Sequence, residues 1–136
     1  MFEILEHTAD IGFRARGSTV AGLFESSALA MCSISAELVN VRPRLEYPLA
    51  ALGEDYESLL VNWLSEILYW TDGRQLALRE FRVSHIEPTA VRGVARGEPR
   101  DPQRHPARVI VKAVTYHQLK VLEEADGWMA EVYLDI

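Results

Sequence analysis

The chain has 136 residues, 49% of them hydrophobic and 25% charged, which is typical of one globular domain. Its formal net charge of −6 argues against a protein that coats a nucleic-acid backbone, because phosphate binding requires a positive field. The single cysteine, Cys32, excludes an intramolecular disulfide; we expect a small buried hydrophobe, with a reactive thiol as the alternative. The start carries no signal-peptide pattern and no stretch suits a membrane span, so we expect a cytoplasmic protein with no membrane or DNA partner.

The first third of the chain predicts two strands and a helix. Residues 2–5 suit a short strand, and residues 11–16 alternate apolar and polar side chains as a half-buried strand does. Gly17 ends this strand, and the following Ser18-Thr19 pair can accept a hydrogen bond from a free amide at a helix start. The helix itself is expected over residues 20–34 because one face stays apolar.

The middle third contains the clearest helix in the sequence. Before it, residues 38–52 are expected to be extended, with two prolines that suit an edge strand or an irregular one. Glu54 and Asp55 place negative charge at the N-terminal end of the helix, and Asp72-Gly73 supplies its C-terminal stop. The helix is expected to be the central packing element because it carries an apolar stripe: Leu59, Leu60, Trp63, Leu64, Ile67 and Leu68.

From residue 76 onward the pattern changes to strands separated by loops. We predict strands over residues 76–86, 90–95, 108–117, 120–122 and 128–134. The proline-containing stretch 97–107 predicts a loop, and Asp126-Gly127 indicates a tight hairpin turn. Residues 1–136 are therefore expected to form a single α+β domain, with a largely antiparallel β-sheet and two α-helices packed on it.

Motifs that carry chemistry are few. The sequence has no Gly-x-x-x-x-Gly-Lys loop, no Gly-x-Ser-x-Gly elbow, no His-Glu-x-x-His and no Cys-x-x-Cys pair, so it does not point to a common class of enzyme. What remains is the polar loop from His7 to Gly12, between two apolar strands. The Asp10 carboxylate with backbone carbonyls suits a hard cation such as Ca²⁺ or Mg²⁺. The alternative is an aspartate that caps its own backbone turn.

Asp135 is the second carboxylate of interest. It follows the apolar strand at 132–134 and precedes Ile136, whose carboxylate adds a further anionic ligand. If the first and last strands are neighbours, Asp10, Asp135 and the Ile136 carboxylate come together, and such a group repels strongly unless a cation lies between its members. The sequence alone does not decide whether they meet.

Histidines and arginines supply secondary candidates. His7 suits either a softer metal or proton transfer, or a hydrogen bond that holds its loop. His105 and His117 are further candidates, although His117 is interpreted first as a structural hydrogen-bonding partner. The segment from Arg92 to Arg108 carries five arginines and is predicted to be a mobile loop. It suits contact with phosphate, RNA or an acidic protein face, with a plain solvated loop as the alternative.

Several of these segments, in order and spacing, resemble the archease family along nearly the whole chain. The blocks are EHTADIG (6–12), LLVNWL (59–64), EILY (66–69), GE (97–98) with RH (104–105), VKAVTYH (111–117) and VYLDI (132–136). Departures are mild: Ser65 stands where Asn is frequent, and Leu134 where Phe is usual. Neither position is among the ligands that the resemblance implies.

The resemblance implies a small accessory protein, not an enzyme, that promotes guanylylation and repeated turnover of a GTP-dependent RNA ligase in tRNA splicing or RNA repair. GTP belongs to that partner ligase. The resemblance also implies a divalent cation held by Asp10, Asp135 and Ile136, with Ca²⁺ expected first and Mg²⁺ or Mn²⁺ as alternatives. Lys112, within the VKAVTYH block, joins the secondary candidates.

Three other functions stay open at this point. The first is a chaperone-like binding module for an RNA-modifying enzyme, in which the metal is purely structural. The second is a free-standing metal-dependent enzyme, against which the absence of a nucleotide-cradling motif counts. The third is direct RNA contact, confined to the segment 92–108; otherwise contact with RNA is indirect, through the ligase.

Overall fold

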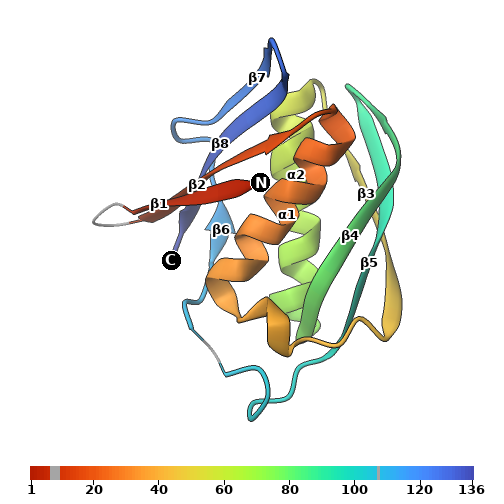
Figure 1. Cartoon of the computed structure of the whole chain (residues 1–136), viewed down its shortest axis with the longest axis vertical. Coiled ribbons are helices and arrows are strands. Elements are labelled where there is room, and N and C mark those ends of the chain that lie inside the picture. The colour runs from red at the N-terminus through yellow and green to blue at the C-terminus, as the bar shows by residue number, and fades with distance from the viewer. Residues whose placement is uncertain (7–9, 107) are drawn as a thin grey trace.

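The computed structural model of the chain describes residues 1–6, 10–106 and 108–136, so the predicted site residue His7 lies outside the described residues. Within those ranges the chain forms an antiparallel five-stranded sheet, here sheet A, an antiparallel three-stranded sheet, here sheet B, and two α-helices. Figure 1 shows the helices α1 and α2 between the two sheets, so that each helix has a sheet on either side. The predicted α+β fold is confirmed, and the division of its strands between two sheets is a further finding.

Sheet A joins the two ends of the described chain. Its strands are β1 (Phe2–Glu6), β2 (Asp10–Gly17), β6 (Ala113–Val114), β7 (Lys120–Glu124) and β8 (Gly127–Asp135). They follow the order β1-β2-β8-β6, and β7 pairs with the first part of β8. β8 therefore lies inside the sheet, with β2 along one side and β7 and β6 along the other.

Sheet B consists of β3 (Leu45–Leu52), β4 (Leu76–Glu87) and β5 (Ala90–Pro99), in the order β3-β5-β4. Pro48 lies in β3, which is an edge strand as predicted. The central strand needs glycine where β4 comes close: a Cβ at Gly97 would lie 2.0 Å from the carbonyl oxygen of Ala77. The close approach of two strands thus explains a glycine inside a strand.

The helices start where the sequence provides caps. α1 (Val20–Ser35) begins after Thr19, whose hydroxyl accepts a hydrogen bond from the Gly22 amide at 3.0 Å. α2 (Tyr56–Leu68) begins after Asp55, which forms a reciprocal capping box with Ser58. A 3-10 turn (Leu38–Asn40) follows α1, and a π-helical turn (Tyr69–Gly73) follows α2, so the predicted stop at Asp72-Gly73 holds.

The core lies between the sheets and around α2, as the apolar stripe predicted. Trp63 is fully buried, and its indole nitrogen donates a hydrogen bond to the carbonyl of Phe24 on α1 at 3.1 Å. Burial of each large apolar side chain contributes roughly 1.5–3 kcal/mol. The fully buried core includes Phe13, Leu23, Phe24, Leu59, Leu60, Trp63, Leu64, Ile67, Val91, Val132 and Leu134.

Cys32 lies on α1 and is buried, which confirms the expected small hydrophobe. Burial raises the pKa of its thiol to about 12. Because the thiolate is the reactive form, this cysteine is inert at neutral pH. Across the described ranges, no helix is long and apolar enough to cross a membrane.

Two local predictions in the second half were wrong. The stretch 97–107 was expected to be a loop, but β5 continues to Pro99 because its backbone pairs on both sides, with β3 up to Gly97 and with β4 up to Pro99. The stretch 108–117 was expected to be a strand, but only Ala113–Val114 is one. The residues before it follow the end of α1 instead, where the Arg108 amide donates to the Ser35 carbonyl at 3.3 Å.

Candidate functional site

Asp10 and Asp135 are direct neighbours across two strands of sheet A. Asp10 is the first residue of β2 and Asp135 the last residue of β8, and the antiparallel register places them opposite each other. Opposed residues in such a pair point to the same face, with their Cβ atoms about 4.5–5.5 Å apart. The sequence-based condition, that the first and last strands be neighbours, is not met; β2 lies between them, and the two aspartates meet because Asp10 belongs to β2.

The rest of this corner comes from β6 and from the residues after β8. The Lys112 amide donates to the Asp135 carbonyl oxygen at 2.8 Å, so this predicted secondary candidate lies beside the aspartate pair with an exposed side chain. Ala113 stands opposite Asp135 on the side away from Asp10. Ile136 follows directly and is exposed. We call Asp10, Asp135 and Ile136 the acidic corner.

The next residues along the same face of the sheet form an aromatic platform. Tyr133 is opposite Gly12, and its ring lies where a Cβ on that glycine would be, 2.5 Å from the nearest ring carbon. The His117 ring packs edge-on against Tyr133 with ring centroids 6.2 Å apart. The secondary candidate His117 is therefore on the face of the acidic corner, in ring contact with Tyr133.

The acidic corner places two carboxylates directly opposite each other on neighbouring strands. Two like charges directly opposite each other on neighbouring strands destabilise a sheet, and a cation between them removes that repulsion. Among the described residues, no three His, Cys, Asp or Glu side chains gather as metal ligands. A cation at this corner therefore needs main-chain or terminal oxygens beside the two carboxylates, which suits hard cations that bind oxygen.

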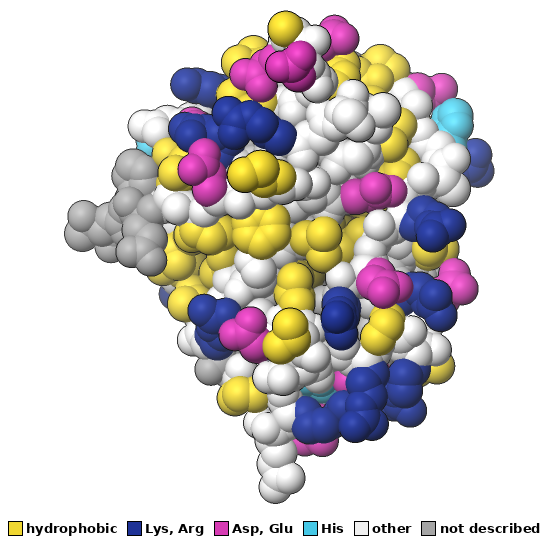
Figure 2. Space-filling model, in the orientation of Figure 1, with side chains coloured by type: hydrophobic (Ala, Val, Ile, Leu, Met, Phe, Trp, Pro, Cys, Tyr) yellow, Lys and Arg dark blue, Asp and Glu magenta, His cyan; other side chains and the backbone are white. Residues whose placement is uncertain are grey.

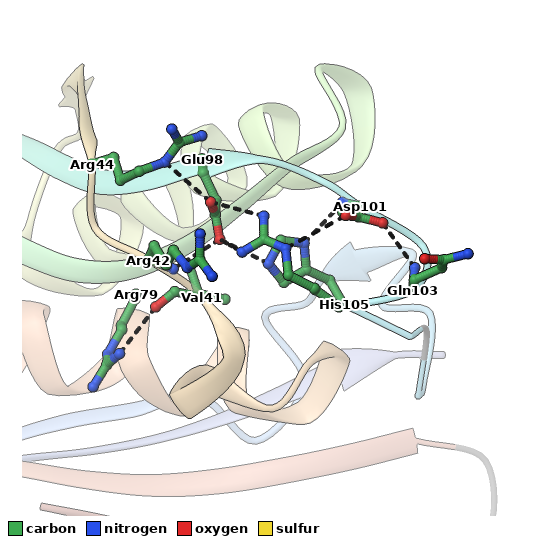
Figure 3. Close-up of polar contacts among 9 residues, drawn as sticks. Val41, Arg42, Arg44, Arg79, Glu98, Asp101, Gln103 and His105 are labelled. Atoms are coloured by element: carbon green, nitrogen blue, oxygen red, sulfur yellow. Dashed lines mark hydrogen bonds and ion pairs between the residues drawn. The ribbon is translucent and has the colours of Figure 1, made fainter.

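His105 lies in a buried hydrogen-bonded cluster and not beside the acidic corner. It is buried, its Nδ1 accepts a hydrogen bond from the Asp101 amide at 2.8 Å, and its Nε2 lies 3.0 Å from a carboxylate oxygen of Glu98. Since Nδ1 accepts, Nε2 carries the proton and donates it to Glu98. With both ring nitrogens engaged, His105 holds the loop after β5 onto sheet B (Figure 3).

Glu98 is the centre of that cluster, and its carboxylate is fully buried. Arg104 donates to both of its oxygens, at 3.0 and 3.1 Å, and the Arg42 amide donates at 2.8 Å. The Nε atom of Arg44 lies 3.3 Å from it. The bonds from Arg104, then those from Arg42 and His105, lower the pKa of the Glu98 carboxyl to about 2 against the opposing effect of burial.

The predicted arginine loop from Arg92 to Arg108 is wrong in its first part. Arg92 and Arg96 lie in β5, exposed on the outer face of sheet B. Arg104 is bound to Glu98 and to Asp101, so it is not mobile. Arg92 and Arg96 are exposed because side chains alternate between the two faces of a strand. Arg104 is held in place by the buried carboxylate of Glu98.

Glu98 is the residue that the sequence did not single out. It shares a strand face with Arg92 and Arg96, a pattern typical of solvated charge. The available signal was the pair of short blocks, Gly97-Glu98 and Arg104-His105, which the fold brings into direct contact.

Comparisons with known proteins identify the family of this chain. The chain matches the model of the Archease protein family over residues 2–136. It is 41% identical over 139 residues to Protein archease of Methanosarcina acetivorans, with 99% of this chain and 95% of the relative covered. Protein archease of Methanopyrus kandleri is also 41% identical, over 138 residues and 99% of both chains.

Solved structures share the fold. The solution structure of Methanobacterium thermoautotrophicum protein 1598 has a TM-score of 0.87 and 35% identity, with 99% of this chain and 98% of that chain covered. The crystal structure of an archease, possible chaperone, from Thermotoga maritima has a TM-score of 0.65 and 19% identity, with coverage of 97% and 94%; at that identity it supports the fold alone. Because family model, relatives and fold agree along the chain, this protein belongs to the archease family.

Proposed function

We propose that this archease is a cytoplasmic accessory protein of a GTP-dependent RNA ligase, and that it promotes guanylylation and repeated turnover of the ligase in tRNA splicing or RNA repair. It catalyses no reaction of its own, and GTP is bound by the ligase. The observation that carries the proposal is the direct pairing of Asp10 with Asp135. These are the two aspartates at which resemblance to the family implies metal ligands.

The cation of this proposal is held by the carboxylates of Asp10 and Asp135 and by an oxygen of Ile136. Such an all-oxygen set fits Ca²⁺, with Mg²⁺ or Mn²⁺ as alternatives. When bound, the cation supplies positive charge of the kind that phosphoryl transfer requires at phosphate oxygens. The aspartates set its place where β2 begins and β8 ends, and the backbone amide of Lys112 donates a hydrogen bond to the Asp135 carbonyl there.

The net negative charge of the chain also supports a partner with a positively charged surface. The chain carries a net charge of −6, and an RNA-binding ligase presents positive surface, so complementary charge speeds their encounter. Contact with RNA is then either indirect, through the ligase, or made by the arginines between Arg92 and Arg108 in the positions that β5 and its following loop give them.

The test is multiple-turnover ligation with purified ligase, GTP and metal, with Asp10→Asn and Asp135→Asn as variants. Each substitution removes one of two opposed charges, so the variants should be at least as stable as the wild type without metal, yet lose stimulation. Asp126→Asn, an equal change of charge in the turn between β7 and β8, is the matched control and should stimulate normally. Full stimulation by both corner variants would sink the proposal.

A chaperone-like role is the second candidate, since the Thermotoga maritima relative in fold is described as a possible chaperone. In that role the protein stabilises an RNA-modifying enzyme and its cation is structural. Thermal melting with and without chelator separates the two. A large fall in melting temperature, with activity restored equally by any divalent cation, favours the structural role; a small fall with strict dependence on one cation favours the ligase role.

A further inference from the structure

Away from the acidic corner, positive charge is concentrated on the side of the molecule that carries sheet B. The segments 38–52 and 74–108, which include sheet B and its connections, hold ten arginines, no lysine and five acidic residues; the rest of the chain holds four basic and 15 acidic residues. Figure 2 shows Lys and Arg side chains gathered at the lower right of this view, where Figure 1 places the segment before β3 and the end of β5. The C-terminus lies on the opposite side of the view.

The arginines on this side outnumber the carboxylates that face them. Arg42, Arg44 and Arg104 surround Glu98, as Figure 3 shows for the labelled residues. Both Glu98 oxygens are already engaged by Arg104, by the Arg42 amide, by His105 and by Arg44. Because this carboxylate is fully buried and saturated, it cannot neutralise a further guanidinium.

The guanidinium of Arg42 is a positive charge that no described carboxylate pairs with. Its backbone amide binds Glu98, but its guanidinium is exposed and forms no hydrogen bond or ion pair with any described residue. Arg44 contacts Glu98 through Nε at 3.3 Å, and its side chain is 59% exposed to solvent. The three arginines exceed the two carboxylates beside them, Glu98 and Asp101, and a further bound anion relieves the repulsion that this excess of positive charge causes.

Arg42 and Arg104 line a surface hollow whose side chains can donate hydrogen bonds to an anion. Its lining residues are Val39, Asn40, Arg42, Gln103, Arg104 and Pro106. Two arginines and two residues with carboxamide side chains are among them, and none of the described lining residues is acidic. The wall formed by the loop after β5 is held in place, since Asp101 accepts hydrogen bonds from the Gln103 amide at 3.0 Å and from the His105 amide at 2.7 Å.

We propose that this hollow binds a phosphate group, with Arg42 as the residue that contacts it and Glu98 as the residue that positions Arg104. Arginine forks match the oxygens of phosphate bidentately and stay charged at all relevant pH values. The phosphate comes either from a free or small-molecule phosphate or from the end of an RNA strand. This inference does not rest on the proposed ligase role, because it concerns a different ligand and residues before β3 and after β5, away from the acidic corner.

The experiment is titration of the whole protein with inorganic phosphate, followed by NMR signals of the arginine Nε–H groups and of the Asn40 and Gln103 side-chain amides. Saturable shifts are expected in the wild type. Arg42→Gln should weaken binding at least tenfold while melting like the wild type, since its guanidinium supports no contact. Arg92→Gln is the matched control, with the same loss of charge on an exposed β5 residue outside the hollow, and should bind phosphate normally.

Competition identifies the source of the phosphate. Displacement of inorganic phosphate by a short RNA with a 5′-phosphate, but not by the same RNA with a 5′-hydroxyl, assigns the hollow to a strand end. Displacement by neither RNA assigns it to a free phosphate. The proposal is overturned if phosphate gives no saturable shift, if Arg42→Gln binds as the wild type does, or if Arg92→Gln weakens binding equally, because diffuse charge then accounts for the effect.

Discussion

Substitution of Glu98 by Gln tests whether the buried carboxylate holds the end of sheet B together. Gln has the same shape but no charge, so Arg104 loses its paired anion and Arg44 loses its contact. The side-chain NH2 group of the new Gln is a hydrogen-bond donor. It would face groups that also donate, among them the backbone amide of Arg42. The fold should persist, because the hydrophobic core between the sheets does not include this residue.

The expected loss in the free energy of unfolding follows from the lowered pKa of the Glu98 carboxyl. The pKa of Glu98 falls from 4.5 to about 2 on folding, and a difference of that size is worth about 3 kcal/mol. An independent route gives a similar value, since removal of one partner from a buried ion pair costs roughly 3–5 kcal/mol. The Glu98 side chain is buried, but 34% of the Arg104 side chain is exposed to solvent, so we use about 3 kcal/mol, the lower end of this range.

The sign of the pH dependence is set by the lowered pKa. The stabilisation from Glu98 is fully present above the unfolded-state pKa, near 4.5, and is lost as the pH falls toward the folded-state value of about 2. The wild type should therefore exceed Glu98→Gln by about 3 kcal/mol at pH 7 and by about half that at pH 3. Glu98→Gln lacks this component at every pH.

Urea unfolding at pH 7 and pH 3 measures both differences. Glu80→Gln, an exposed β4 position opposite Arg96, is the control and should shift the free energy of unfolding by under about 0.5 kcal/mol. A difference between wild type and Glu98→Gln that stays the same at both pH values would refute the assignment of the stabilisation to the buried charge. A difference below about 1 kcal/mol at pH 7 would refute its magnitude.

Three further predictions concern the framework. Gly97→Ala should lower the free energy of unfolding by more than about 2 kcal/mol in urea titration, because the added Cβ meets the Ala77 carbonyl; a neutral effect would contradict the close approach of β4 and β5. Asp55→Ala should cost about 1 kcal/mol, since Ser58 loses its capping partner, and retention of wild-type stability would show that the cap contributes nothing. Cys32 should react with a thiol reagent at neutral pH only after urea unfolding, because burial raises its pKa to about 12; rapid labelling of the folded protein would contradict this.

The helices were predictable because their signals are local. The expected helix over 20–34 is observed as Val20–Ser35, and the hydroxyl of Thr19 caps it as the sequence suggested. The apolar stripe around Trp63 likewise predicted the buried face of α2. Periodicity and caps act within a few residues, so they can be read without knowledge of the partners.

The sheets were less predictable because their limits depend on distant partners. β5 runs to Pro99 because β4 pairs with it up to that residue, and Arg108 is not in a strand because its amide bonds to the end of α1. The aspartate pair was predicted only on the condition that its strands be neighbours. The burial of Glu98 could not be predicted for the same reason. It is buried by the loop after β5, which folds back over it, and by the segment at Arg42.

The pairing of β2 with β8 also decides when this protein can fold. Asp10 finds its partner only after synthesis has reached Asp135, and pairings between residues so far apart in sequence form slowly because a long loop must close first. Until then the β1–β2 hairpin keeps an open edge, which invites pairing with other chains. We therefore expect the acidic corner to assemble late, and a growing chain to depend on dilution or on cellular folding helpers until its last strand is in place.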